Sequence, residues 1–183
     1  MYQIEISNGI DLYNKYLFVP VKVDDAQSIA SGEVHENEVC FSVSSIYVEV
    51  FLFHFLKKHF DPTLKYNSHR VTNWRNDTYQ CVFDELGGYN FYTYDTIRKM
   101  IIDLEETARL LETDFDNPLV APIISRYEVC YLHAPDSEAW EEFGEVKDHV
   151  SVVCDFYRRV AKSLLYAIEN SSEYDLFNVE YGY

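Results

Sequence analysis

The stretch TYDTIRKMIIDLEETARLLETDFDN, residues 93–117, marks a change in the hydrophobic period of the chain. Apolar residues recur in it at spacings of four and three: Ile97, Ile101, Leu104, Ala108 and Leu111. This spacing places them on one face of an α-helix. Thr93 can cap that helix, Asp95 favours its first turn through the helix dipole, and Asn117-Pro118 ends it. The stretch therefore predicts an amphipathic helix that covers a hydrophobic core.

Two further helices are predicted on either side of this one. The same rhythm continues near the C-terminus at Val146, Val150, Val153, Tyr157, Val160, Leu164 and Ile168. Asn170-Ser-Ser closes this helix, which we expect to be the longest, and Gly144 interrupts its front end. The third helix is expected from Ser44 or Ser45 to Phe60, although its apolar residues between 46 and 52 also alternate as in a strand.

Strands are expected in the rest of the chain, where β-branched and aromatic residues alternate with polar ones. The candidate strands are residues 2–6, 16–23, 38–43, 78–83, 89–92, 123–132 and 177–181. Pro20 lacks a ladder donor and favours an edge position or a bulge, and Gly87-Gly88 suits a hairpin turn. Together the segments predict an α+β fold in one domain, residues 1–183. It has a mostly antiparallel sheet packed on one side by about three helices.

The charge of the chain is strongly negative and unevenly distributed. The formal net charge is −16, and residues 103–148 carry thirteen acidic side chains against three basic ones. Such a field repels phosphate backbones, so direct nucleic-acid binding is disfavoured, and it attracts basic protein surfaces. The simpler interpretation is that the acidic surface promotes solubility. The charge favours a basic protein as the partner.

The densest acidic stretch is DSEAWEEFGEVKDHV, residues 136–150, with six carboxylates and one lysine. Carboxylates steer basic partners, and aromatic side chains supply the apolar centre of protein interfaces. Tyrosines are also concentrated around the predicted hairpin, residues 78–92. The predicted partner-binding residues are Glu138, Trp140, Glu141, Glu142, Glu145, Asp148, Tyr89 and Tyr92. The sequence thus predicts a non-catalytic acidic protein that neutralises or occludes a basic partner, as immunity proteins, antitoxins and inhibitors do.

Two other functions are left open by the same stretch. On a continuous helix, Glu141, Glu145 and His149 form a ridge of metal-ligand types, which would suit a small metal-dependent hydrolase. The chain has no Glu-x-x-His motif, so we expect neither a metal nor another cofactor, and no catalytic residues. The remaining alternative is a nucleic-acid mimic that competes for a DNA-binding protein.

The sequence also bears on where the protein acts. It begins without a basic and apolar leader, and its longest apolar segment, residues 46–56, is too short to cross a membrane. The widely spaced Cys40, Cys81, Cys130 and Cys154 are expected to be buried free thiols. These observations predict a soluble cytoplasmic protein; the oligomeric state stays open.

Overall fold

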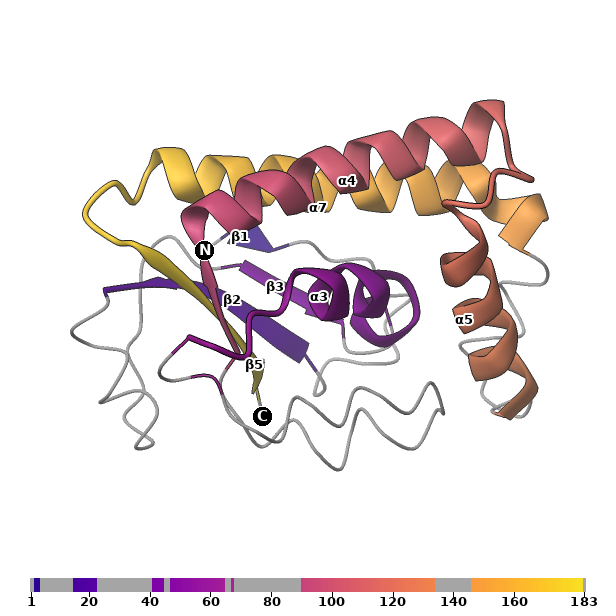
Figure 1. Ribbon diagram of the computed structural model, residues 1–183. Helices are drawn as coiled ribbons and strands as arrows, with labels where there is room; N and C mark the ends of the chain where they lie inside the picture. The colour runs from indigo at the N-terminus through magenta and orange to yellow at the C-terminus, as the bar shows by residue number, and fades with distance from the viewer. Residues whose placement is uncertain are drawn as a thin grey trace.

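The structure, a computed structural model, describes residues 2–3, 15–22, 41–44, 47–64, 67, 90–133 and 146–182. For residues 2–3, 129–133 and 180–182 it describes only the backbone. Within these ranges a sheet lies beneath two long helices, and a shorter helix crosses their end (Figure 1). The α+β class predicted from the sequence is confirmed.

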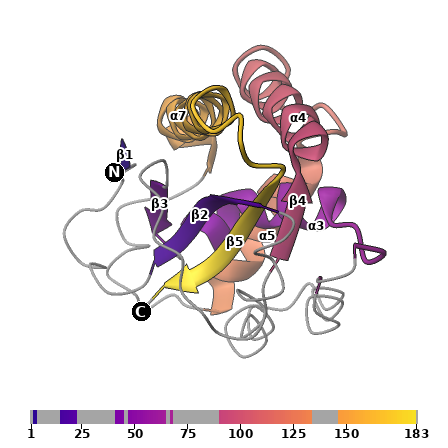
Figure 2. The same cartoon turned by 90° about the vertical axis from the view of Figure 1, so that its left-hand side faces the viewer.

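The sheet is built from both ends of the chain. Its strands have the order β1-β3-β2-β5-β4. Their bounds are β1 Tyr2–Gln3, β2 Lys15–Val21, β3 Phe41–Ser44, β4 Asn90–Thr93 and β5 Leu176–Gly182. Strands β2 to β5 pair antiparallel, while β1 pairs parallel with β3. The C-terminal strand β5 lies between β2 and β4, so the fold brings the last residues of the chain into the middle of the sheet (Figure 2).

The two faces of the sheet are both apolar, as the alternation along β2 shows. Tyr16 and Phe18 join the main core under the helices, whereas Val19 and Val21 belong to a smaller cluster with Phe91 and Leu176. Pro20 was expected at an edge position or a bulge, but β2, the strand that contains it, lies between β3 and β5 in the sheet. Among the described residues, the pairing of β2 with β3 covers Lys15 to Phe18.

Helix α4, Tyr94–Thr113, confirms the helix predicted from the opening stretch. The Thr93 hydroxyl accepts a hydrogen bond from the backbone N–H of Thr96 at 3.2 Å, which is an N-cap. All five predicted apolar positions are buried. The helix ends at Thr113, with Asp114 as its C-cap, before the predicted stop at Asn117-Pro118.

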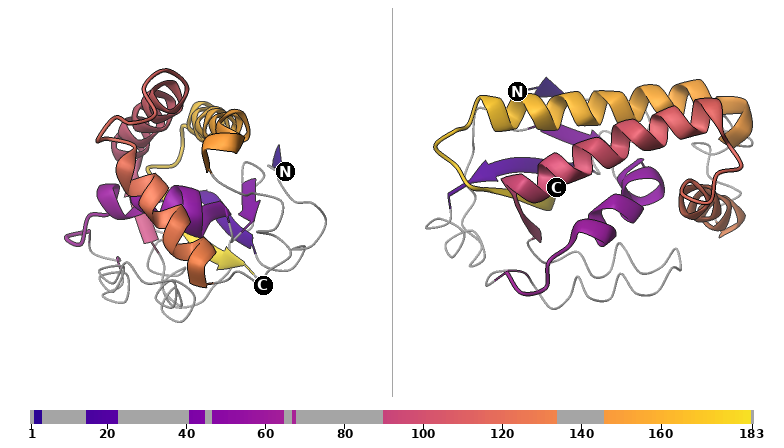
Figure 3. Two further views of the ribbon diagram at one scale, coloured as in Figure 1. Left: turned by 90° about the vertical axis from the view of Figure 1, so that its right-hand side faces the viewer. Right: turned by 45° about the horizontal axis from the view of Figure 1, so that its top comes forward.

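Helix α7, Val150–Glu169, is preceded by the 3-10 turn η4, Val146–His149. Together they form the longest helical segment, 24 residues, as predicted. Helices α4 and α7 run antiparallel and side by side over the sheet (Figures 1 and 3). Their contact is close, because the Cys154 thiol on α7 reaches the Ala108 carbonyl on α4 at 3.2 Å.

The predicted helix before Phe60 is present as two joined pieces. A π-helical turn η1, Val48–Leu52, leads into α3, Phe53–His59. Every residue of η1 is buried. Because apolar side chains point in all directions from this turn, its sequence fits a strand as well as a helix. Burial on all sides explains the ambiguity of the pattern.

The strand predicted at 123–132 is wrong, because these residues belong to helix α5, Ala121–His133. Val120, Ile123 and Tyr127 are buried at spacings of three and four, which is helical periodicity. Pro122 lies in the first helical turn, where the missing N–H group costs no hydrogen bond. Helix α5 crosses the end of the α4–α7 pair (Figure 3).

The predicted strand 89–92 is confirmed as β4, which pairs with β5. The other predicted half of its hairpin, residues 78–88, lies outside the described residues. On the edge of β4 away from β5, the side-chain amide of Asn67 forms hydrogen bonds with the backbone of Phe91. The Phe91 N–H donates to Asn67 Oδ1 at 2.7 Å, and Asn67 Nδ2 donates to the Phe91 carbonyl at 3.2 Å.

Two further predictions, on the cysteines and on membrane spans, can be compared with the structure only for the described residues. Cys154 is a buried free cysteine, and burial raises its pKa to about 11, with a smaller contribution from Glu112. The side chains of Cys40, Cys81 and Cys130 lie outside the described residues. No helix in the described part of the chain is both long and apolar enough to span a membrane.

Candidate partner-binding surface

The predicted partner-binding surface is described by the structure only in part. Two of its eight residues, Asp148 and Tyr92, have described side chains. The others lie outside the described residues: Tyr89, Glu138, Trp140, Glu141, Glu142 and Glu145. The structure therefore shows only the C-terminal end of this surface, at η4, and the elements next to it.

Tyr92 does not belong to this surface. Its side chain is 1% exposed and lies in the main core, and its hydroxyl donates to the Leu56 carbonyl at 2.9 Å. Burial raises the pKa of this phenol far above its ordinary value. Tyr92 was assigned to the surface because tyrosine is common in interfaces. Its place on the helix-covered face of β4 makes it a core residue instead.

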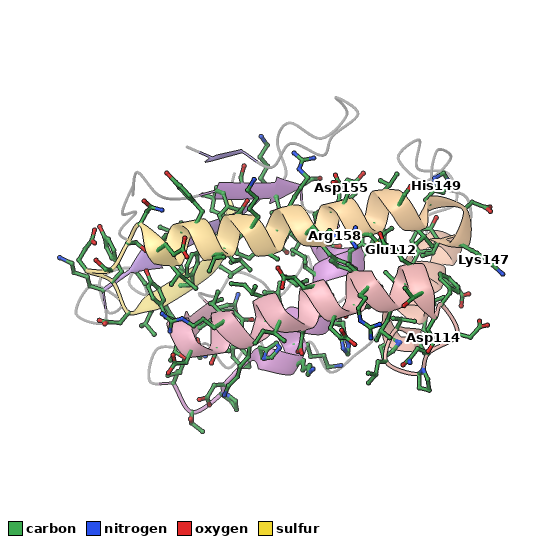
Figure 4. All side chains as sticks on the ribbon, turned by 90° about the horizontal axis from the view of Figure 1, so that it is seen from above. Glu112, Asp114, Lys147, His149, Asp155 and Arg158 are labelled. Atoms are coloured by element: carbon green, nitrogen blue, oxygen red, sulfur yellow. The ribbon has the colours of Figure 1, made fainter. Side chains whose placement is uncertain are left out.

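Asp148 is exposed on η4, where the chain enters α7. Lys147 is exposed beside it, and His149 occupies the N-cap position of α7. Figure 4 shows Lys147 and His149 at the same end of the helix pair as Glu112 and Asp114 of α4. The acidic stretch thus ends next to the C-terminus of α4.

The carboxylate of Glu112 at this end is neutralised inside the fold. Arg158 on α7 donates two hydrogen bonds to it, at 2.8 and 2.6 Å, across the two helices (Figure 4). These hydrogen bonds lower the pKa of Glu112 below its ordinary value. The pair is exposed and contributes little stability, but it removes Glu112 from the anionic surface.

Other carboxylates of α4 are paired in the same way. Glu106 accepts from Arg109, Asp95 accepts from Arg98, and Asp103 accepts from Lys58. The carboxylates of this helix are therefore largely neutralised by neighbouring cations. Glu105 and Asp116 remain exposed, with no ion pair among the described residues.

The negative charge of the protein resides mostly outside the described part of the chain. The whole chain has 31 acidic and 15 basic residues. Among the residues whose side chains the structure describes, fifteen are acidic and twelve are basic. The described part is close to neutral at −3, against −16 for the chain. Its basic residues are thus nearly matched by its own carboxylates.

The metal-ligand ridge expected from Glu141, Glu145 and His149 is described only at His149. The chain forms a 3-10 turn over 146–149 before α7 begins at Val150, so the α-helical spacing assumed for the ridge does not continue to His149. Among the described residues, no three histidine, cysteine or acidic side chains lie close enough together to hold a metal ion.

Comparisons of the chain with protein-family models, with curated proteins and with solved structures found no match. The functional proposal rests on the residues of this chain alone.

A basic cavity between α3 and α5 was not foreseen from the sequence. It includes Lys57, Lys58 and Arg126. The two lysines lie near the end of the helix predicted before Phe60, and Arg126 lies in the segment 123–132, which was predicted as a strand. A helical periodicity for 120–127 was the signal that would have placed Arg126 near α3.

Proposed function

We propose that the protein is a non-catalytic binding protein. Its acidic stretch 136–148 docks on a basic protein partner and occludes or neutralises it, in the manner of an immunity protein, antitoxin or inhibitor. In this proposal it acts in the cytoplasm and contacts neither nucleic acid nor membrane. Binding, and not catalysis, is the role that its charge favours.

The observation that carries the proposal is the imbalance between the two parts of the chain. The side chains that the structure describes sum to a charge of −3, so the rest of the chain carries −13 of the total of −16. Six carboxylates and one lysine in 136–150 make a strong local negative field. Such a field raises the association rate with a basic protein and excludes acidic ones.

The C-terminal end of this stretch adjoins the helix pair α4–α7. Val146, at its end, is buried, and the following η4 turn continues directly into α7. Helix α7 is held against α4 by a buried apolar seam and by the Arg158–Glu112 pair. Asp148 lies on an element that is already ordered in the folded protein. A partner that contacts it therefore loses little conformational entropy in ordering this surface.

The test is affinity capture from extracts of the native host at low salt. The bait is the full chain, compared with a variant that carries Glu138→Gln, Glu141→Gln, Glu142→Gln and Glu145→Gln. A control bait carries four exposed changes elsewhere: Glu105→Gln, Glu128→Gln, Glu169→Gln and Glu173→Gln. Both variants lose four charges, so they differ only in where the charge is lost.

We expect the wild-type and control baits to capture one basic protein that the first variant does not retain. Equal capture by all three baits contradicts the proposal. Capture of a DNA-binding protein that added duplex DNA displaces favours the nucleic-acid mimic instead. Zinc, iron or manganese bound stoichiometrically to the purified protein favours the metal-dependent hydrolase.

A further inference from the structure

A cavity of about 370 Å³ lies between α3 and α5. Its wall combines apolar surface with three cationic side chains, Lys57, Lys58 and Arg126; the other lining residues are Phe53, His54, Pro122 and Ser125. Cavities that bind small molecules in proteins have a similar size and the same mixture of apolar walls and a few polar groups. Three cationic side chains around one cavity are unexpected in a chain of charge −16.

Arg126 is the central group of this cavity. Its side chain is only 5% exposed, its Nε donates to the Glu49 carbonyl at 3.1 Å, and its guanidinium lies 4.2 Å from the centroid of the Phe53 ring. Neither terminal nitrogen has a hydrogen-bond partner within the described part of the chain. No carboxylate among the described residues lies within ion-pair distance of it. A buried guanidinium normally has several acceptors, so this one is left with unused donors.

Lys57 and Lys58 line the same cavity as Arg126. Lys57 Nζ lies 5.7 Å from the centroid of the same Phe53 ring. Burial and the nearby charge of Lys58 lower the pKa of His54, as expected where a further positive charge is disfavoured. Two acidic residues lie near the cavity: Glu49, which contacts Arg126 through its carbonyl and has a buried side chain, and Asp103, which already accepts hydrogen bonds from Lys58 and His59 at 2.6 and 2.7 Å.

We propose that this cavity binds a small organic anion, a phosphate or carboxylate joined to an apolar group. The anionic group faces Arg126 and Lys57, and the apolar group packs on Phe53 and Pro122. Arginine recognises both anions through paired hydrogen bonds. The terminal nitrogens of Arg126 are shielded from solvent, so direct contact requires the guanidinium to turn toward the cavity, whereas electrostatic attraction acts without that movement.

Local backbone structure positions these groups for such a role. The Glu49 carbonyl that orients Arg126 belongs to η1, and π-helical turns occur frequently at functional sites. Phe53 directly follows η1 and presents its ring to the Arg126 guanidinium and to Lys57. The cavity is distinct from the acidic stretch 136–148, so this proposal does not depend on the proposed function.

The test is titration calorimetry of the full chain with phenyl phosphate and with benzoate. We expect at least one of them to bind with a Kd below about 1 mM. Phenol and inorganic phosphate, the separate halves of phenyl phosphate, should each bind roughly tenfold more weakly or worse. The tighter of the two aromatic anions identifies the preferred anionic group.

Three variants locate the site. Lys57→Gln and Arg126→Gln should weaken binding, the second by about tenfold or more, because it removes the guanidinium. Ser125→Phe changes an exposed residue at the cavity and should block entry without a change of charge. Lys162→Gln, an exposed lysine on α7, is the control and should bind as the wild type does.

Arg126 is buried, so circular dichroism must first show that Arg126→Gln is folded; if it is not, Lys57→Gln and Ser125→Phe decide the result. The proposal is overturned if the wild type binds neither aromatic anion. It is equally overturned if Lys57→Gln and Ser125→Phe leave the affinity unchanged, or if phenol binds as tightly as phenyl phosphate.

Discussion

Two tyrosine hydroxyls fasten the η1–α3 segment to the elements around it. Tyr157 of α7 donates to the Phe51 carbonyl, and Tyr92 of β4 donates to the Leu56 carbonyl, both at 2.9 Å. Both side chains are buried, and burial raises the pKa of each phenol well above its ordinary value. At the residue scale, the abundance of tyrosine is therefore explained in part by the core.

We predict that Tyr157→Phe lowers the free energy of unfolding by about 1–2 kcal/mol, because the Phe51 carbonyl remains buried without its donor. Chemical denaturation followed by circular dichroism measures the change. Tyr166→Phe is the control: that side chain is 51% exposed, and we expect a change of less than about 0.5 kcal/mol. Equal effects of the two substitutions would mean that the Tyr157 hydrogen bond contributes nothing.

Single residues also set the limit of what the sequence predicts. A tyrosine in a strand alternates between the two faces of the sheet, and only the pairing of the strand determines which face lies under the helices. Tyr92 was therefore assigned to a surface although it is buried. Arg126 was not recognised at all, because its position depends on the helical conformation of α5.

At the scale of elements, strong periodicity was sufficient for prediction. Helices α4 and α7 were predicted because long four-three repeats have no competing interpretation. Residues 123–132 were assigned wrongly because a short segment with two isoleucines and two tyrosines fits both a helix and a strand. The strand order could not be predicted, since the position of β5 between β2 and β4 depends on contacts distant in the sequence.

Among the described residues, the side chain of Asn67 covers the outer edge of β4, and this arrangement gives a second prediction. Asn67→Asp keeps the acceptor for the Phe91 N–H but loses the donor to the Phe91 and Asp61 carbonyls. The new carboxylate faces both carbonyls, so we expect a loss of about 1–3 kcal/mol in the free energy of unfolding. Urea denaturation measures it.

Asn170→Asp is the matched control, because Asn170 is exposed and donates to a single carbonyl, that of Tyr166. We expect this change to cost less than the one at Asn67. If both variants unfold at the same urea concentration, the amide of Asn67 does not protect the strand.

We expect the stability contributed by the contact between α3 and α4 to depend on pH. Burial acts to raise the pKa of Asp103, but hydrogen bonds from Lys58 and His59 outweigh it, so the pKa lies below 3.8. A lowered pKa in the folded state means that the ionised carboxylate stabilises the fold above pH 3.8. This stabilisation is lost as the pH falls through the folded-state pKa.

We therefore predict that Asp103→Asn lowers the Tm by about 2 °C at pH 7, and that the difference from wild type narrows below pH 3.8. Differential scanning calorimetry between pH 2 and pH 7 measures it. Asp155→Asn, an exposed change on α7, is the control. A difference that stays constant over this range would show that the ionised carboxylate does not stabilise the α3–α4 contact.

At the scale of the whole molecule, the sequence predicted the charge but not its distribution over the fold. Carboxylates on α4 are largely paired with cations. The Arg158–Glu112 pair joins α7 to α4, so residue spacing within one helix could not have predicted it. The described body has a charge of −3 against −16 for the chain. Of the sixteen acidic residues outside this body, five lie within residues 136–145, which is the densest group, so the stretch 136–148 is the centre of the proposed function.

The central claim is that unneutralised carboxylates of 136–148 attract a basic protein. The most direct measurement is the association rate with the captured partner between about 50 and 500 mM salt. We predict a steep fall of the wild-type rate with salt, and a slower, flatter profile for the variant Glu138→Gln, Glu141→Gln, Glu142→Gln, Glu145→Gln. Identical rates and identical salt dependence for the two proteins would contradict the claim.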